Sequence, residues 1–107
     1  MKKNFTTEEA KEIGEKLGIN WSKYDIEQFR IGMGVELEHG TVNSNTNVTD
    51  DNPLKTGKIA LAHLNELTDY YTRLLEMEDE GEEYWKTHSE KHITSEKIKE
   101  LARKEGL

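Results

Sequence analysis

Cysteine is absent from this chain of 107 residues, and proline occurs only once. The lack of thiols excludes disulfide bridges and thiolate metal sites. No apolar run approaches the ~18 residues of a membrane span. The first residues, Met1–Asn4, lead into acidic residues rather than into the apolar stretch of a secretion signal. We therefore expect a cytoplasmic protein that does not enter a membrane.

Apolar residues and basic charge are both scarce. Apolar residues make up 33% of the chain, charged residues make up 35%, and the mean hydropathy is −0.93. A domain usually takes about 100–200 residues, so a second domain and a large core are excluded. The 15 Lys and Arg residues are outnumbered by 22 Asp and Glu, which gives a net charge of −7. Direct nucleic-acid binding needs clustered Lys and Arg, so we expect none.

The apolar residues that are present recur at helical spacing, and no stretch alternates as a half-buried strand does. Thr6 and Glu9 have the spacing of a capping box, which predicts a first helix over 7–17 that ends at Gly18. A second helix is expected over about 23–39. The residues expected to face the core from these two helices are Ala10, Ile13, Gly14, Leu17, Ile26, Phe29, Met33 and Leu37.

The second half of the chain also has helical spacing. Residues 40–53 are rich in Asn, Asp and Thr, whose side chains compete for backbone hydrogen bonds, so a loop is predicted there. A long third helix is expected over about 54–79, ended by Gly81, and a last helix over about 95–105. The residues expected to face the core are Ala60, Leu64, Leu67, Tyr71, Leu74, Ile98, Leu101 and Ala102.

These elements predict an all-α fold: a compact bundle of three to four main helices with an Asn/Asp-rich loop between helices two and three. A single domain is expected over 1–107, with its core in 5–80 and a C-terminal helical extension over 81–107. Residues 5–19 also resemble residues 93–107. Any short capped amphipathic helix would give this likeness. Alternatively, a terminal element is duplicated, and its copies pack side by side or bind partners alike.

The densest group of metal-ligand residue types lies on helices two and three. Glu36 and His39 are three residues apart, as are His63 and Glu66, so each pair shares one face of its helix. Both pairs lie at the flank of an apolar stripe, and antiparallel packing of the two helices would bring them together. Imidazole and carboxylate groups suit Zn, Fe or Mn. We therefore name these four residues as a candidate metal site.

Three neighbouring residues could support that site. Glu38 is turned away from His39 and is a surface or supporting group, and Tyr70 could bind the metal or orient a ligand. Arg73 could pair with a carboxylate or an anion, or stack on its neighbouring tyrosine. Two alternatives stay open for the whole group: a polar network between helices without a metal, and unrelated surface residues.

Three further patterns are weaker. His88 and His92 have the i, i+4 spacing of a ligand pair but lack the glutamate of a zinc-protease motif. Asparagine occupies every second position of residues 43–47, as ligand residues do in a calcium-binding loop. However, Val48 stands where that loop needs glycine. The acidic run 76–83 is typical of a solvated helix face, and it could also attract a basic partner.

The candidate site also carries a resemblance. The segments Val35-Glu-Leu-Glu-His-Gly40, Gly57-Lys-Ile-Ala-Leu-Ala-His-Leu-Asn-Glu66 and Asp69-Tyr-Tyr-Thr-Arg-Leu74 resemble a family of small bacterial and phage proteins that is classed as a domain of unknown function. The resemblance covers roughly residues 5–80. It implies that these segments form one functional unit, and it implies no activity. Thr68 stands where such relatives usually have proline, which predicts a straighter third helix here.

Two functions therefore compete, and neither identifies an enzymatic reaction. The first is a small soluble helical protein that binds Zn, Fe or Mn through the four His and Glu residues. The second is a non-enzymatic acidic module that binds a protein with a basic surface. A phage-derived protein that acts on a host protein would fit this interpretation. A third interpretation is an accessory domain whose polar residues only specify helix packing. Oligomeric state and any substrate are outside what the pattern predicts.

Overall fold

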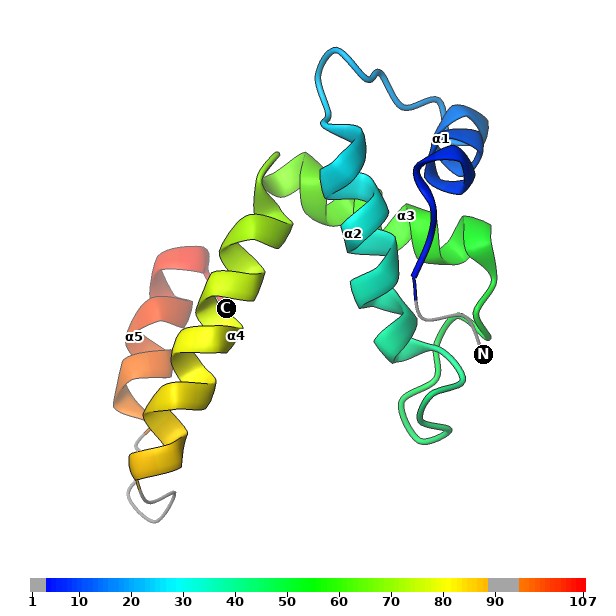
Figure 1. The fold of residues 1–107 in the computed structure, drawn as a ribbon. Helices are drawn as coiled ribbons and strands as arrows, with labels where there is room; N and C mark the ends of the chain where they lie inside the picture. Colours follow the sequence, from blue (N-terminus) through cyan, green and yellow to red (C-terminus); the bar gives the residue numbers. More distant parts are fainter. Residues whose placement is uncertain (1–3, 89–94) are drawn as a thin grey trace. The chain divides into compact units, whose positions relative to one another are not determined.

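The computed structural model describes residues 4–88 and 95–107, and in this part of the chain it contains only helices, turns and loops. This described part of the chain has five α-helices, labelled in Figure 1, and one short 3-10 helix, where three to four main helices were expected. Their bounds are α1 (Thr7–Lys16), α2 (Ile26–Glu36), η1 (Leu37–His39), α3 (Pro53–Glu66), α4 (Tyr70–Thr87) and α5 (Glu96–Glu105).

The chain divides into two compact units. The N-terminal unit, Met1–Glu76, contains α1, α2, η1, α3 and the start of α4, and the C-terminal unit, Met77–Leu107, contains the rest of α4 and α5. Each unit is described by itself below. None of the described helices is both long and apolar enough to cross a membrane.

Helix α1 begins and ends as its sequence predicts. The Thr6 hydroxyl accepts a hydrogen bond from the Glu9 amide at 3.1 Å, and the Glu9 carboxylate accepts one from the Thr6 amide at 2.9 Å. This reciprocal pair is the expected capping box. At the other end, Gly18 has a φ of +76°, and the Ile19 amide donates to the Gly14 carbonyl at 2.9 Å. Glycine supplies the left-handed residue that such a helix end requires.

Helix α2 is shorter than the predicted 23–39. Asp25 caps its N-terminus by accepting a hydrogen bond from the Glu27 amide, and the α-helix ends at Glu36, where η1 continues for one turn. Phe29 and Met33 are fully buried, as the stripe predicts. The helix therefore carries the centre of the core, and Glu36 comes one turn after Met33 on the same side.

The segment between η1 and α3 is held by its own side chains. The Thr41 amide and hydroxyl both donate to the Asp51 carboxylate, at 2.9 Å and 2.6 Å. Asp51 has a φ of +60°, a conformation that Asp and Asn adopt more readily than most residues. Asn52 then caps α3 by accepting a hydrogen bond from the Lys55 amide at 3.0 Å, with Pro53 at the first helical position. These contacts close the segment and set the start of α3.

The single long helix predicted over 54–79 is wrong. Helix α3 ends at Glu66, Leu67 has an extended backbone (φ −143°, ψ 120°), and α4 begins at Tyr70. The Asp69 carbonyl accepts the first helical hydrogen bond of α4, from the Arg73 amide at 3.2 Å, so Asp69 stands where N-cap residues stand. The straighter helix expected from Thr68 is therefore not found, and Leu67, expected in the core, is 49% exposed.

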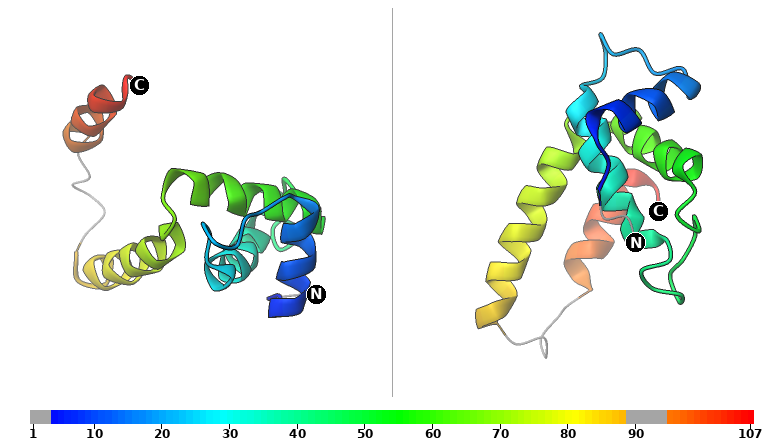
Figure 2. Two further views of the ribbon diagram at one scale, coloured as in Figure 1. Left: turned by 90° about the horizontal axis from the view of Figure 1, so that it is seen from above. Right: turned by 45° about the vertical axis from the view of Figure 1, so that its right-hand side comes forward.

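The core of the N-terminal unit lies where α2 crosses α1 and α3, which pack directly against it. Figure 2 shows α2 and α3 side by side in both views. Gly57 of α3 allows a close approach, because a Cβ there would lie 2.8 Å from Ile13 of α1 and 3.0 Å from Leu17, the C-cap of α1. The fully buried Ala60 and Leu64 follow on the same side of α3. A small core is thus built by close backbone contact as well as by large side chains.

Two expectations for the C-terminal unit are wrong. Gly81 does not end a helix, because α4 continues to Thr87. Ile98 and Leu101 do not face a core: α5 has no buried residue, and these side chains are 63% and 45% exposed. The amphipathic pattern identifies an apolar face, but it does not say what covers that face.

Candidate functional site

Glu36 is the centre of a buried polar cluster in the N-terminal unit. Its residue is only 3% exposed, at the end of α2. Its Oε2 accepts a hydrogen bond from the Tyr71 hydroxyl at 2.7 Å and lies 3.1 Å from Nδ1 of His63. We call Glu36, His63 and Tyr71 the Glu36 cluster. It joins α2, α3 and α4, so the carboxylate has a partner from each of the two neighbouring helices.

His63 is fixed on two sides. Its Nδ1 lies 3.0 Å from the Tyr71 hydroxyl oxygen as well as close to Glu36, and its ring stacks on Tyr70 with centroids 4.4 Å apart and planes within 4°. An ionised carboxylate can only accept, so the contact with Glu36 requires the proton on Nδ1. The other ring nitrogen, Nε2, is then the basic one, and the side chain is 29% exposed.

The structure does not bring all four candidate ligands together. His39 lies next to the Glu36 cluster, with its Nε2 3.9 Å from Oε1 of Glu36, and its side chain is 54% exposed. Glu66 is on the exposed side of α3 and is not among the groups that contact Glu36 or His63. Glu38 is also exposed. The cluster thus contains two of the four candidates, with His39 at its edge.

The sequence predicts Tyr71 in the core, but the role of its hydroxyl as a partner of Glu36 was not predicted. Burial, and then the neighbouring Glu36 carboxylate, raise the pKa of the Tyr71 phenol above its ordinary value. The Gln28 side chain accepts a hydrogen bond from the Tyr71 amide at 3.2 Å and so holds the first turn of α4. A signal was present: a tyrosine on a core stripe needs a hydrogen-bond partner for its hydroxyl, and Glu36 stood on a neighbouring stripe.

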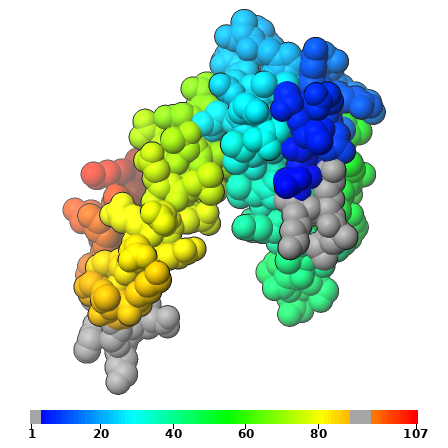
Figure 3. All heavy atoms as spheres, in the orientation of Figure 1, coloured from blue at the N-terminus to red at the C-terminus, as the bar shows by residue number. Residues whose placement is uncertain are grey.

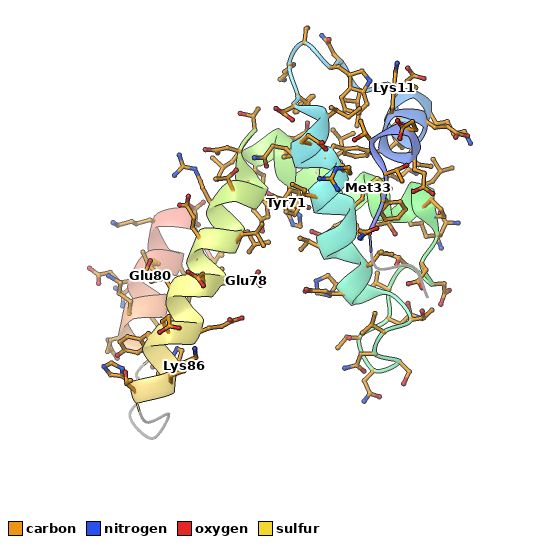
Figure 4. The ribbon with its side chains drawn as sticks, viewed as in Figure 1. Lys11, Met33, Tyr71, Glu78, Glu80 and Lys86 are labelled. Atoms are coloured by element: carbon orange, nitrogen blue, oxygen red, sulfur yellow. The ribbon has the colours of Figure 1, made fainter. Side chains whose placement is uncertain are left out.

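A glycine places the Tyr71 ring. A Cβ on Gly32 of α2 would lie 2.3 Å from the ring of Tyr71, so the ring occupies the space that any other residue would fill. Figure 4 shows the Tyr71 side chain pointing from α4 towards α2. The ring packs on the bare backbone of Gly32, and from there its hydroxyl reaches the Glu36 carboxylate.

The remaining candidates lie away from this cluster. Arg73 pairs with Asp69 one turn earlier, with Nε 3.0 Å from both carboxylate oxygens, and this pair is exposed. Hydrogen bonds to Asp69 raise the pKa of Arg73. His88 stacks on Tyr84 at the end of α4, and His92 lies outside the described residues. Over residues 4–88 and 95–107, no group of three His, Asp or Glu side chains is arranged to hold a metal ion.

The C-terminal unit exposes a second candidate site, on the later part of α4. Met77, Tyr84 and Trp85 recur at helical spacing and are 57%, 49% and 44% exposed. We call these three residues the distal α4 surface. Tyr84 and Trp85 contact each other edge to face, with centroids 4.9 Å apart. In Figure 3 this part of α4, coloured yellow to orange, lies at the surface of the molecule.

Carboxylates border the distal α4 surface. Glu80 lies one turn from both Met77 and Tyr84, and Glu82 lies one turn before Trp85. Glu78 and Glu80 extend from opposite sides of the helix (Figure 4). Carboxylates of the acidic run 76–83 therefore border the distal α4 surface on both of its sides. Exposed apolar side chains bordered by charge are typical of a surface that binds another protein.

The fold and the site together define an all-helical protein with a buried glutamate–histidine–tyrosine cluster. Residues 10–80 match the family model described as a protein of unknown function (DUF5661), and the chain belongs to that family. No curated protein and no solved structure matches the chain. The matched residues contain the whole Glu36 cluster and, of the distal α4 surface, only Met77.

Proposed function

We propose that this protein is a non-enzymatic interaction module whose distal α4 surface binds a helix with an apolar face and basic borders. The observation that carries the proposal is the exposure of Met77, Tyr84 and Trp85 between carboxylates. Aromatic residues with an apolar body and a polar edge are favoured at protein interfaces. The carboxylates would attract a basic partner and select against acidic ones.

In this proposal the Glu36 cluster is structural. It fixes the start of α4 against α2 and α3, through Tyr71 and His63. A fully partnered buried polar network allows one packing arrangement of the helices that carry it. The N-terminal unit would then be the folded support from which α4 extends its binding residues.

A peptide library tests the proposed function. Peptides selected on the intact protein should carry apolar residues at helical spacing with Lys or Arg beside them. The Tyr84→Ala/Trp85→Ala variant should lose this selection, and the control variant Val42→Ala/Val48→Ala, whose positions are 59% and 71% exposed in the loop before α3, should keep it. Selection of the same peptides by the aromatic variant, or of none by the intact protein, would overturn the proposal.

A transition-metal ion at His63 is the second candidate function. With Nδ1 facing the Glu36 carboxylate, His63 has the arrangement in which proteins orient a metal-binding imidazole through its other nitrogen. His39 and Glu66 would complete the ligands only after their side chains turn towards Nε2 of His63. Zn, Fe and Mn all accept imidazole and carboxylate ligands.

Metal titration tests this second candidate. Dialysis against Zn²⁺, Mn²⁺ or Fe²⁺, followed by metal analysis, should give one ion per chain for the intact protein and none for His63→Ala. His88→Ala removes an exposed imidazole outside the Glu36 cluster and is the matched control. Absence of stoichiometric metal, or equal binding by His63→Ala, would exclude a site at His63.

A further inference from the structure

Helix α5 has an apolar face that the described residues of the C-terminal unit leave largely exposed. None of its residues is buried, and Ile98 and Leu101 are 63% and 45% exposed. Helices shorter than about 12–15 residues are marginal in water without packing, and α5 runs only from Glu96 to Glu105. A surface that covers Ile98 and Leu101 would therefore stabilise α5.

The end of α5 has the same cap as the end of α1. Gly106 has a φ of +75° and the Leu107 amide donates to the Ala102 carbonyl at 2.9 Å, as Gly18, Ile19 and Gly14 do at the end of α1. Leu107, which follows this cap, is 93% exposed. Because α1 uses this arrangement while packed on α2 and α3, the likeness of the two chain ends extends from their sequences to their helix ends.

Helix α5 cannot take the place of α1, however. Ala102 aligns with Gly14, where a Cβ would lie 2.3 Å from the Trp21 ring. Ile98 aligns with Ala10, which is fully buried. Both changes add atoms where the N-terminal unit has no room for them. The surface that covers α5 is therefore a different one.

Charge indicates which surface this is. On α5, Lys97 and Lys104 lie one turn on either side of Leu101, while Lys99 precedes Ala102 by one turn and Arg103 follows one turn after Lys99. The apolar face thus has basic residues on both sides, and Glu105, one turn after Leu101 and Ala102, is an acidic residue on the face itself. The distal α4 surface has the opposite pattern, with aromatic residues between carboxylates. The two faces are complementary both in apolar character and in sign of charge.

We propose that α5 of one copy packs on the distal α4 surface of a second copy, and that the second copy returns the same contact. This inference rests on the proposed function, because it names the helix that the distal α4 surface binds. A second copy is the occupant because the described residues of α5 and the distal α4 surface leave each other exposed within the C-terminal unit, whereas a reciprocal exchange covers both surfaces at once. Such a two-fold arrangement closes on itself and leaves neither surface open for further copies.

Charge reversal tests the exchange. Sedimentation equilibrium of the intact protein should give twice the 12.4 kDa of one chain. Reversing the α4 border with Glu78→Lys/Glu80→Lys, or the α5 border with Lys97→Glu/Lys99→Glu, should weaken the dimer at least ~10-fold. The control Lys55→Glu/Lys58→Glu makes the same change of charge as the α5 reversal, on exposed residues of α3, and should leave the dimer intact.

Mixing the two reversed variants gives the decisive result. Each variant alone repels its own kind, but in the mixture lysines of one α4 meet glutamates of the other chain's α5, and the remaining pair is unchanged. A mixed dimer should therefore form at the strength of the intact protein. A monomeric intact protein, or reversed variants that dimerise normally, would overturn the exchange.

The two proposals fail in different ways. If the intact protein is monomeric and still selects basic amphipathic peptides through Tyr84 and Trp85, the proposed function stands and the second copy is the wrong partner. If the peptides are not selected and the protein is monomeric, both proposals fail. Dimerisation that survives Leu101→Glu and both charge reversals would place the contact elsewhere in the chain.

Discussion

The Tyr71 hydroxyl donates a 2.7 Å hydrogen bond to the Glu36 carboxylate inside the N-terminal unit. Both residues are nearly inaccessible to solvent, at 1% and 3% exposed. A buried carboxylate without partners would be very costly, so its bonds to Tyr71 and to His63 decide whether α2, α3 and α4 can pack as they do.

Neutralising Glu36 should destabilise the protein without changing its shape. In Glu36→Gln the charge-assisted hydrogen bond from Tyr71 becomes an ordinary one, and we expect a free energy of unfolding lower by about 1–2 kcal/mol. Urea denaturation followed by circular dichroism measures the difference. Glu38→Gln, on an exposed neighbour, should change it by less than ~0.5 kcal/mol. Equal effects of the two substitutions would contradict the buried role of Glu36.

The raised pKa of Tyr71 predicts a loss of stability in alkali. Unfolded tyrosine ionises near pH 10, whereas burial and then Glu36 keep the folded phenol neutral at higher pH. The contribution is therefore complete below about pH 10 and is lost progressively above it. Tyr71→Phe loses the hydrogen bond at neutral pH but cannot ionise.

The measurement for Tyr71 is the difference in unfolding free energy between the intact protein and Tyr71→Phe, from pH 7 to pH 11. This difference should narrow as the pH rises. Tyr84→Phe, at an exposed position, should show a constant difference over the same range. A difference for Tyr71→Phe that does not change with pH would contradict the raised pKa.

A methyl group at Gly32 should push α2 and α4 apart. Alanine is the better helix former by about 1 kcal/mol, but its Cβ would lie 2.3 Å from the Tyr71 ring. We expect Gly32→Ala to lower the free energy of unfolding by about 1–3 kcal/mol, as overpacking does. Gly81→Ala, in α4 with open space around it, should raise thermal stability instead. A stabilised Gly32→Ala variant would show that the Tyr71 ring can move.

Asp51 should titrate below its ordinary pKa. The Thr41 hydroxyl, and then the Thr41 amide, donate hydrogen bonds that lower the pKa of the Asp51 carboxyl. The contacts that close the loop should therefore persist to acidic pH and be lost as the pH falls through that lowered pKa. Carbon NMR titration of the carboxyl group measures it directly.

Thr41→Val removes the hydroxyl and keeps the amide, so it should return the Asp51 pKa part of the way to its ordinary value. Thr46→Val alters a loop hydroxyl that bonds the Asn43 carbonyl instead, and it should leave Asp51 unchanged. If the pKa of Asp51 is the same in Thr41→Val as in the intact protein, the Thr41 hydroxyl does not stabilise the carboxylate.

The sequence predicts the helices best where a local signal acts alone. The capping box at Thr6 and Glu9 and the left-handed Gly18 are confirmed, because each depends only on residues within one turn. The break at Leu67 was missed because Ala60, Leu64, Tyr71 and Leu74 keep helical spacing across it. Asp69 was the available sign, since aspartate commonly caps the helix that follows it.

The site was harder to predict because it depends on contacts between helices. Helical spacing places Glu36 and His63 at the flanks of their stripes, but the 3.1 Å contact depends on how α2 and α3 cross. Glu66 has the same spacing from His63 and faces solvent. Gln28 carries no motif at all, and only the start of α4 beside it shows its role. For α5, periodicity identifies Ile98 and Leu101 as an apolar face. The local sequence does not say which surface covers that face.

The bare backbone at Gly32 has a consequence for the wider family. Because the Tyr71 ring fills the space beside it, these two positions should vary together among the other members: glycine at the first should accompany a ring at the second. Where the second position holds a smaller side chain, alanine or serine becomes acceptable at the first. Correlated substitution between these positions would mark which relatives keep the same crossing of α2 and α4.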